Sequence, residues 1–254
     1  MDLTHAAITF AAGLVAGGIN AVAAGGTLLT FPLLVWLGLD SITANATSTV
    51  ALWPFVVGGI FGYRREIATI ERRWLAFAIP SIAGGFMGAA LLRLTPSNVF
   101  DRIVPYLILF ATLLFAAQDP IQRMLKAGNP DAHKSERWFA AAMVFQLGIG
   151  VYGGYFGAGI GIIMLAGFSV LGMTNIHQMN GLKNILAGTV NAVAAVYFIF
   201  HDMVHWPDVG ALAAGAMLGG YGGAGVARKV GQKFVRRAVI IVGFAMAASL
   251  FIKR

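Results

Sequence analysis

Apolar stretches separated by short polar segments run through almost the whole chain. They lie at approximately residues 5–24, 27–39, 44–62, 74–92, 99–117, 138–154, 156–172, 181–200, 208–227 and 235–252. Six of them hold roughly 18 to 20 residues, the length of a helix that crosses a hydrocarbon core of about 30 Å. The others are shorter or interrupted, and residues 27–39 would form a helix of only about 20 Å. The pattern predicts an all-α integral membrane protein with about eight to ten membrane segments.

The composition supports this fold class and excludes several others. Hydrophobic residues make up 58% of the 254 residues and charged residues only 11%, and the mean hydropathy is +0.78. A soluble domain of this size would need far more polar surface. The formal net charge of +8 comes from basic residues between the apolar stretches, so we expect no nucleic-acid partner. Because the chain contains no cysteine, thiol catalysis and Cys-based metal sites are excluded.

An internal repeat divides the chain, with a spacing of about 135 residues. Residues 23–26 correspond to 157–160, and residues 84–89 correspond to 219–224, with glycines at matching places. We therefore predict an N-terminal membrane repeat (1–117), a cytoplasmic linker (118–137) and a C-terminal membrane repeat (138–254). Each repeat has about five segments, which include broken or re-entrant short helices.

The basic residues predict how these segments are oriented. Three loops carry most of them: Arg64, Arg65, Arg72 and Arg73; Arg123, Lys126, Lys134 and Arg137; Arg228, Lys229, Lys233, Arg236 and Arg237. The positive-inside rule places these loops in the cytoplasm and both termini outside, as in a multi-pass protein of the cell (inner) membrane. Each repeat then crosses an odd number of times, so the two repeats have inverted topology.

The glycine-rich breaks are the first candidates for a functional site. Gly25 and Gly26 precede a short helix that starts near Thr27, and Gly157 and Gly159 precede the equivalent helix of the second repeat. Helix N-termini present N–H groups and a positive dipole end, so two that converge near the midplane would bind an anion. For the glycine pairs at 84, 88, 219 and 223, whose spacing is four residues, we favour close helix packing instead.

Polar side chains in the third segment of each repeat are the second group of candidates. Asn45 and Thr49 lie four residues apart on one helix face, and so do Asn180 and Asn184; Asn191 extends the second face, while Asn20 lies within the first break. These side chains either contact the substrate or form interhelical hydrogen bonds worth about 0.6 kcal/mol each.

Two titratable residues extend this group. Lys183 either supplies positive charge to the site or extends to the cytoplasmic interface. His177 is a candidate for proton coupling, although an ordinary interfacial histidine is the simpler interpretation.

The acidic residues point towards an anion rather than a cation as ligand. All lie in loops or at the ends of predicted spans: Asp2, Asp40, Glu66, Glu71, Asp101, Asp119, Asp131, Glu136, Asp202 and Asp208. Cation sites and carboxylate proton relays would therefore lack their usual ligands in the membrane interior. His201 and His205, near two of these carboxylates, form only a weak metal-like pattern. We expect no metal and no cofactor.

Several motifs resemble those of the TauE/SafE family of sulfite exporters. Residues 20–34 read NAVAAGGTLLTFPLL, and the related segments at 44–49, 62–65, 153–161 and 181–184 read ANATST, GYRR, GGYFGAGIG and GLKN. The resemblance covers the whole chain. It implies export or exchange of small sulfur-containing anions, such as sulfite or sulfoacetate, across the cytoplasmic membrane.

Together these observations predict a secondary transporter that works by alternating access between its two halves. Its partners would be a small anionic substrate and the lipid bilayer, and a homodimer is compatible with the sequence. A passive anion channel and a carrier of non-sulfur carboxylates remain open as alternatives. An enzyme is not expected, because the membrane interior offers no Cys, Asp or Glu to act as nucleophile or acid.

Overall fold

The computed structural model describes residues 2–23, 25–62, 64–117, 120, 136–171, 173, 175–230 and 232–252. Its helices are α1 (Leu3–Ala23), α2 (Thr27–Trp36), α3 (Ser41–Gly62), α4 (Arg64–Ile67), α5 (Arg72–Leu75), α6 (Ala78–Leu94), α7 (Ser97–Ala116), α9 (Glu136–Tyr155), α10 (Ile160–Val170), α11 (Ile176–Phe200), α12 (Trp206–Val230) and α13 (Gln232–Ile252). The predicted linker lies almost entirely outside the described residues.

The predicted fold class is confirmed. Four helical stretches in the described part are long and apolar enough to cross a membrane: Leu3–Asn20, Arg72–Leu94, Ser97–Ala116 and Ile176–Phe200. The helices α2 and α10 and the end of α13 are shorter but equally apolar. Large apolar side chains also point outwards, among them Ile79 (69% exposed) and Phe200 (79% exposed), as a surface that faces lipid requires.

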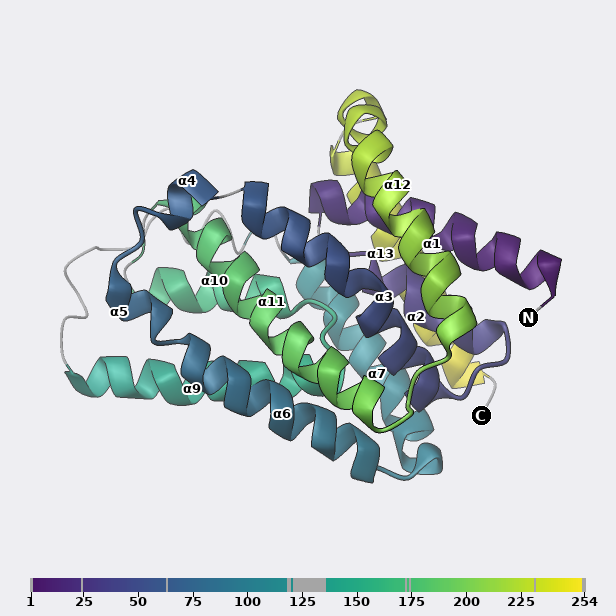
Figure 1. Ribbon diagram of the computed structural model, residues 1–254, viewed down its shortest axis with the longest axis horizontal. Coiled ribbons are helices and arrows are strands. Elements are labelled where there is room, and N and C mark those ends of the chain that lie inside the picture. Colours follow the sequence, from purple (N-terminus) through teal and green to yellow (C-terminus); the bar gives the residue numbers. More distant parts are fainter. Residues whose placement is uncertain are drawn as a thin grey trace.

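Helices distant in sequence pair closely (Figure 1). The helix α1 packs along α12, and α6 packs along α9, so each predicted repeat contributes one helix to each pair. Glycine makes both contacts possible: a Cβ on Gly84 would lie 2.8 Å from the Cα of Gly150, and one on Gly219 would overlap the main chain of Leu14. The predicted packing role of Gly84, Gly88 and Gly219 is thus confirmed, while the surroundings of Gly223 lie outside the described residues.

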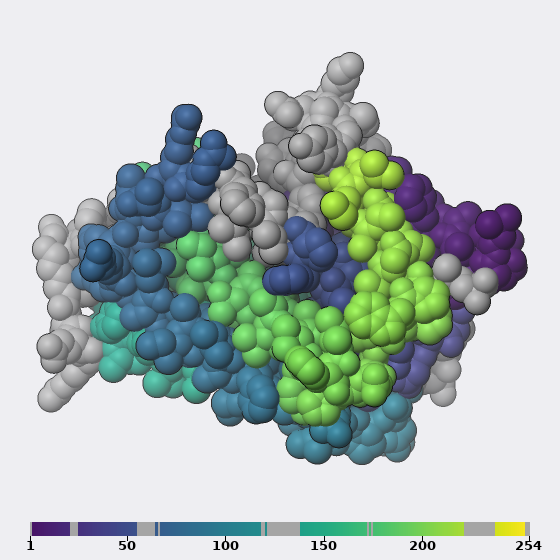
Figure 2. Space-filling model, in the orientation of Figure 1, coloured from purple at the N-terminus to yellow at the C-terminus, as the bar shows by residue number. Residues whose placement is uncertain are grey.

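The long helices α3 and α11 lie side by side at the centre of the molecule. In addition, α3 contacts α12, α11 contacts α6, and α7 contacts α13. The space-filling view shows α6, α11 and α12 next to one another across one face (Figure 2). The central pair thus lies between the two glycine-lined pairs.

Two helix boundaries differ from those predicted, for local reasons. The segment predicted at 156–172 is helical only over Ile160–Val170, because Gly157 and Gly159 both have φ +80° and break the helix. The helix predicted to begin near residue 181 begins at Ile176, where the Asn175 side chain accepts from two main-chain N–H groups. The apolar pattern missed this polar first turn.

One acidic residue differs from expectation in its burial. Asp208 lies in the first turn of α12, at a span end as predicted, but its side chain is fully buried. Its place at a span end agrees with the prediction, whereas its burial did not follow from the apolar pattern. The reason is that α1 covers Asp208, and sequence alone did not indicate that α1 and α12 pair.

Candidate functional site

The break between α1 and α2 is closed by Asn20. Its Oδ1 accepts from the Gly26 N–H at 2.7 Å. A Cβ on Gly26 would lie 2.6 Å from Asn20 Nδ2 and 2.9 Å from the Ala16 main-chain oxygen, so no larger residue fits here. The Thr30 hydroxyl then joins α2 to α3, because its Oγ1 lies 2.6 Å from Ser48 Oγ. The structure thus places Asn20 as a cap for the start of α2, with its Oδ1 already engaged.

The break between α9 and α10 is held from both ends by Tyr152. The Tyr152 main-chain oxygen accepts from the N–H groups of Phe156 (2.9 Å) and Gly157 (3.1 Å). Its phenol donates to the Ala158 main-chain oxygen at 2.6 Å. Gly159 then forms the N-cap of α10 with a left-handed conformation that favours glycine. A segment of only four residues, 156–159, therefore connects α9 to α10.

Both breaks lie against the same turn of α7. A Cβ on Gly25 would lie 2.8 Å from the Phe115 ring, and one on Gly159 would lie 3.5 Å from Leu114 and 3.7 Å from Ala111 Cα. The apolar pattern over residues 99–117 gave no sign of a role for α7 at the site. Its contribution is to bring the starts of α2 and α10 to one region of the protein.

Residues of the first repeat also contact the second break directly. Asn45, only 1% exposed, donates from Nδ2 to the Tyr155 main-chain oxygen at 3.0 Å. Phe31 of α2 packs edge to face on Phe156, with ring centroids 5.4 Å apart. The Oδ1 of Asn45 has no hydrogen-bond partner among the described residues, which leaves one buried acceptor beside the break.

Lys183 brings a cation to the beginning of α10. Its side chain crosses Gly161, where a Cβ would lie 3.0 Å from Lys183 Cδ. Its Nζ donates to Asn180 Oδ1 at 3.1 Å, and Asn180 Nδ2 donates in turn to the Ile176 main-chain oxygen. No carboxylate in the described part of the chain pairs with this ammonium. A positive side chain thus lies beside the positive end of a helix dipole.

The remaining candidates divide into those near the site and those outside it. Asn191, which extends the polar face of Asn180 and Asn184, lies with its Oδ1 3.7 Å from the Cβ position of Gly157. Asn184 is half-buried on α11, and Thr27 is half-buried as the first residue of α2. Thr49 donates to the Asn45 main-chain oxygen within its own helix. His177 is exposed in the first turn of α11, away from the breaks.

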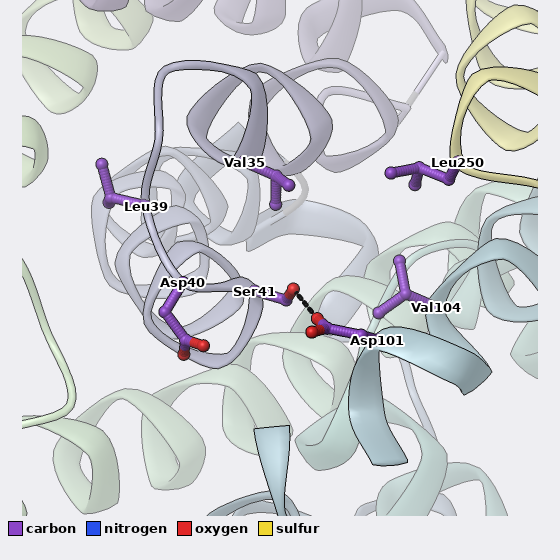
Figure 3. A pocket seen from close by; sticks show the side chains of 7 residues that line it. All are labelled: Val35, Leu39, Asp40, Ser41, Asp101, Val104 and Leu250. Carbon is purple, nitrogen blue, oxygen red and sulfur yellow. Dashed lines mark hydrogen bonds between the residues drawn. The ribbon is translucent and has the colours of Figure 1, made fainter. Parts of the chain in front are cut away.

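A separate cavity of about 330 Å³ opens between the starts of α3 and α7 and the end of α13. Its polar lining is acidic, with Asp40, Ser41 and Asp101, and the Ser41 hydroxyl donates to the Asp101 carboxylate (Figure 3). The carboxylates of Asp40 and Asp101 would repel an anion bound in this cavity. None of the predicted site residues lines this cavity.

Comparison with known proteins gives a consistent identification. The chain matches the Sulfite exporter TauE/SafE family over residues 9–250. It is 27% identical over 244 residues to the probable membrane transporter protein YfcA of Escherichia coli (strain K12), covering 96% of this chain and 88% of that protein. A probable membrane transporter protein of Haemophilus influenzae is 27% identical over 246 residues, covering 96% and 93% respectively. No solved structure matches the chain. The chain is therefore a membrane protein that belongs to the TauE/SafE sulfite exporter family.

Proposed function

We propose that this protein is a secondary transporter that exports or exchanges small sulfur-containing anions, such as sulfite or sulfoacetate, by alternating access. The family membership supports a transport role and makes sulfite-like anions the first substrates to test. The substrate would bind at the α9–α10 break, between α3 and α11. Gly157 and Gly159 would shape the main chain there, and Lys183 would supply the positive charge.

The observation that carries this proposal is the position of Lys183. The Lys183 side chain crosses Gly161 in the first turn of α10, and its ammonium donates to Asn180, which is neutral. A helix N-terminus carries about half a positive charge, so the two repel each other until an anion arrives. A bound anion would relieve this repulsion, whereas a bound cation would increase it.

Helices of each predicted repeat pack against helices of the other repeat, and the pattern of these contacts supports an inverted arrangement. In such an arrangement the pair α1–α12 corresponds to α9–α6, and the contact of α3 with α12 corresponds to that of α11 with α6, as observed. Inverted repeats let one half rock against the other around a central site, which opens the site to each side in turn. The Asn45 contact with Tyr155 would lie on the boundary that moves.

Thermal-shift titration of purified protein tests the site. Sulfite, sulfoacetate, thiosulfate, sulfate and carboxylates are compared on wild type, Lys183→Met and Lys183→Arg. We expect a sulfur anion to raise the unfolding midpoint of wild type and Lys183→Arg, with binding to Lys183→Met about 10- to 100-fold weaker, as for a lost charged hydrogen bond. Equal binding by Lys183→Met would place Lys183 outside the site, and stabilisation by carboxylates alone would favour the carboxylate carrier.

Flux measurements separate a carrier from a channel. In proteoliposomes, a carrier shows saturable uptake and counterflow, in which unlabelled anion inside drives uptake of labelled anion against its gradient. A passive anion channel shows neither. We expect counterflow with wild type, and strictly downhill, unsaturable flux would contradict alternating access.

A further inference from the structure

Three titratable side chains that the anion site does not use meet at the start of α12. Asp208 Oδ1 lies 2.8 Å from His5 Nε2, and Asp208 Oδ2 lies 2.6 Å from His205 Nδ1. The Thr9 hydroxyl adds a third hydrogen bond, to Oδ1, at 3.2 Å. Because an ionised carboxylate only accepts, each ring nitrogen that faces it must carry a proton. We call His5, Asp208 and His205 the His–Asp–His cluster.

The cluster combines a sealed carboxylate with accessible imidazoles. The Asp208 side chain is 0% exposed, whereas the side chains of His5 and His205 are 22% and 42% exposed. Protons can therefore reach the cluster only through the histidines. With both imidazoles neutral, a buried negative charge remains uncompensated, and one added proton makes the cluster neutral.

No other cation supplies this compensation in the described part of the chain. Among the side chains that the structure describes, the remaining charged or titratable groups on the segments around the cluster are Asp2, Asp40, His201, Asp202 and Arg237. The three carboxylates are exposed, and so is Arg237, which follows the far end of α12. The His201 ring stacks on Tyr197 and bonds to the main-chain oxygen of that residue at 2.8 Å. Charge balance at Asp208 thus depends on His5 and His205.

The cluster also joins the two predicted repeats. His5 and Thr9 belong to α1 of the first repeat, and Asp208 and His205 belong to the second. The main-chain N–H of His205 donates to the buried Thr47 hydroxyl at 3.0 Å. Thr47 lies on α3, the helix that also carries Asn45 and Thr49. A movement of one repeat against the other would change these contacts.

We propose that the His–Asp–His cluster is a proton-binding site that couples proton movement to the rocking of the two repeats. The coupling rests on the proposed transport function, whereas the proton-binding site does not. Protonation neutralises the cluster and favours the arrangement in which α1, α12 and α3 are joined. Release of the proton leaves Asp208 without a counter-charge and favours separation of these helices. By thermodynamic linkage, separation of the helices in turn favours release of the proton.

The first test measures proton binding without any substrate. We expect the unfolding midpoint of the full-length wild-type protein in detergent to fall as the pH is raised from about 5 to 8, because loss of a proton would leave the buried Asp208 without a counter-charge. Asp208→Asn should lose this fall, and His201→Gln, the control, should keep it. Should Asp208→Asn fail to fold, the double variant His5→Gln/His205→Gln tests the same point. A pH dependence equal to wild type in these variants overturns the proposal.

The second test measures coupling in proteoliposomes loaded with a pH-sensitive dye. We expect a sulfoacetate gradient to move protons with wild type, and Asp208→Asn to lose proton movement while it retains sulfoacetate exchange. Sulfoacetate transport by wild type without proton movement overturns the coupling but leaves the carrier intact. Absence of any sulfoacetate transport, with the pH-dependent unfolding preserved, overturns the proposed carrier and the coupling, and leaves the proton-binding site.

Discussion

Asn45 of α3 donates a hydrogen bond of 3.0 Å to the main-chain oxygen of Tyr155, a residue 110 positions away at the end of α9. The two are buried or half-buried in the centre of the molecule. This contact connects Asn45, a candidate site residue of the first repeat, to the α9–α10 break of the second repeat. Removing or moving either group should therefore affect the whole site.

Asn45→Ala should weaken both stability and anion binding. The substitution leaves the Tyr155 oxygen buried without its donor, which costs about 1–3 kcal/mol. Thr49→Val is the matched control, because the Thr49 hydroxyl donates at 2.9 Å to the Asn45 main-chain oxygen within its own helix. Thermal unfolding with and without sulfite measures both effects, and equal losses in the two variants would show that the Asn45–Tyr155 contact has no special role.

Gly159→Ala should destabilise the α9–α10 break through main-chain strain alone. The φ of +80° costs an L-residue about 1–2 kcal/mol, while the nearest atoms to the new Cβ, at 3.5 Å, leave ordinary room for it. Gly148→Ala on α9 is the control, because nothing lies within 4 Å and the helix gains about 0.5–1 kcal/mol from alanine. Unfolding midpoints that move in the same direction would contradict this account.

Gly161→Ala should reduce anion affinity with little change in stability. The new Cβ would lie 3.0 Å from Lys183 Cδ and would displace that flexible side chain. Gly167→Ala on the same helix meets Phe145 Cε1 at the same 3.0 Å but lies away from Lys183. A rise in the apparent Kd for the anion is expected only for Gly161→Ala, and a similar rise in both variants would indicate a general disturbance of α10.

Cysteine labelling should report the predicted orientation, since the chain has no natural cysteine. Ser97→Cys and Asp202→Cys lie in exposed segments predicted to be outside, and Ala68→Cys lies in an exposed segment predicted to be cytoplasmic. A membrane-impermeant maleimide added to intact cells should label the first two and spare the third until the cells are opened. Labelling of Ala68→Cys in intact cells would reverse the topology.

Hydrophobic length and glycine position predicted most of the fold. The apolar stretches match the membrane helices closely, because burial in lipid demands long apolar segments and breaks demand glycine. The short helices α4 and α5 were not predicted as separate elements, since α4 lies in a basic loop and the second half of α5 falls within the apolar stretch predicted at 74–92.

Contacts between distant segments were not predictable in the same way. Small residues at a spacing of four indicate a packing face but do not identify the helix that covers it. Neither the α1–α12 pair nor the α6–α9 pair could therefore be predicted from the sequence. For the same reason His5 and Asp208, separated by 203 positions, showed no sign of belonging to one cluster. Tyr152 was missed because an aromatic residue at a helix end is usually part of the core.

The pairing of α1 with α12 has a consequence for how the protein is made. The helix α1 is synthesised long before its main partner α12, so its glycine-lined face must wait in the bilayer until α12 has been inserted. Neither half is then expected to mature on its own, and a truncated chain that ends before α12 should be a substrate for membrane quality control. Two separately encoded halves should assemble when they are synthesised together.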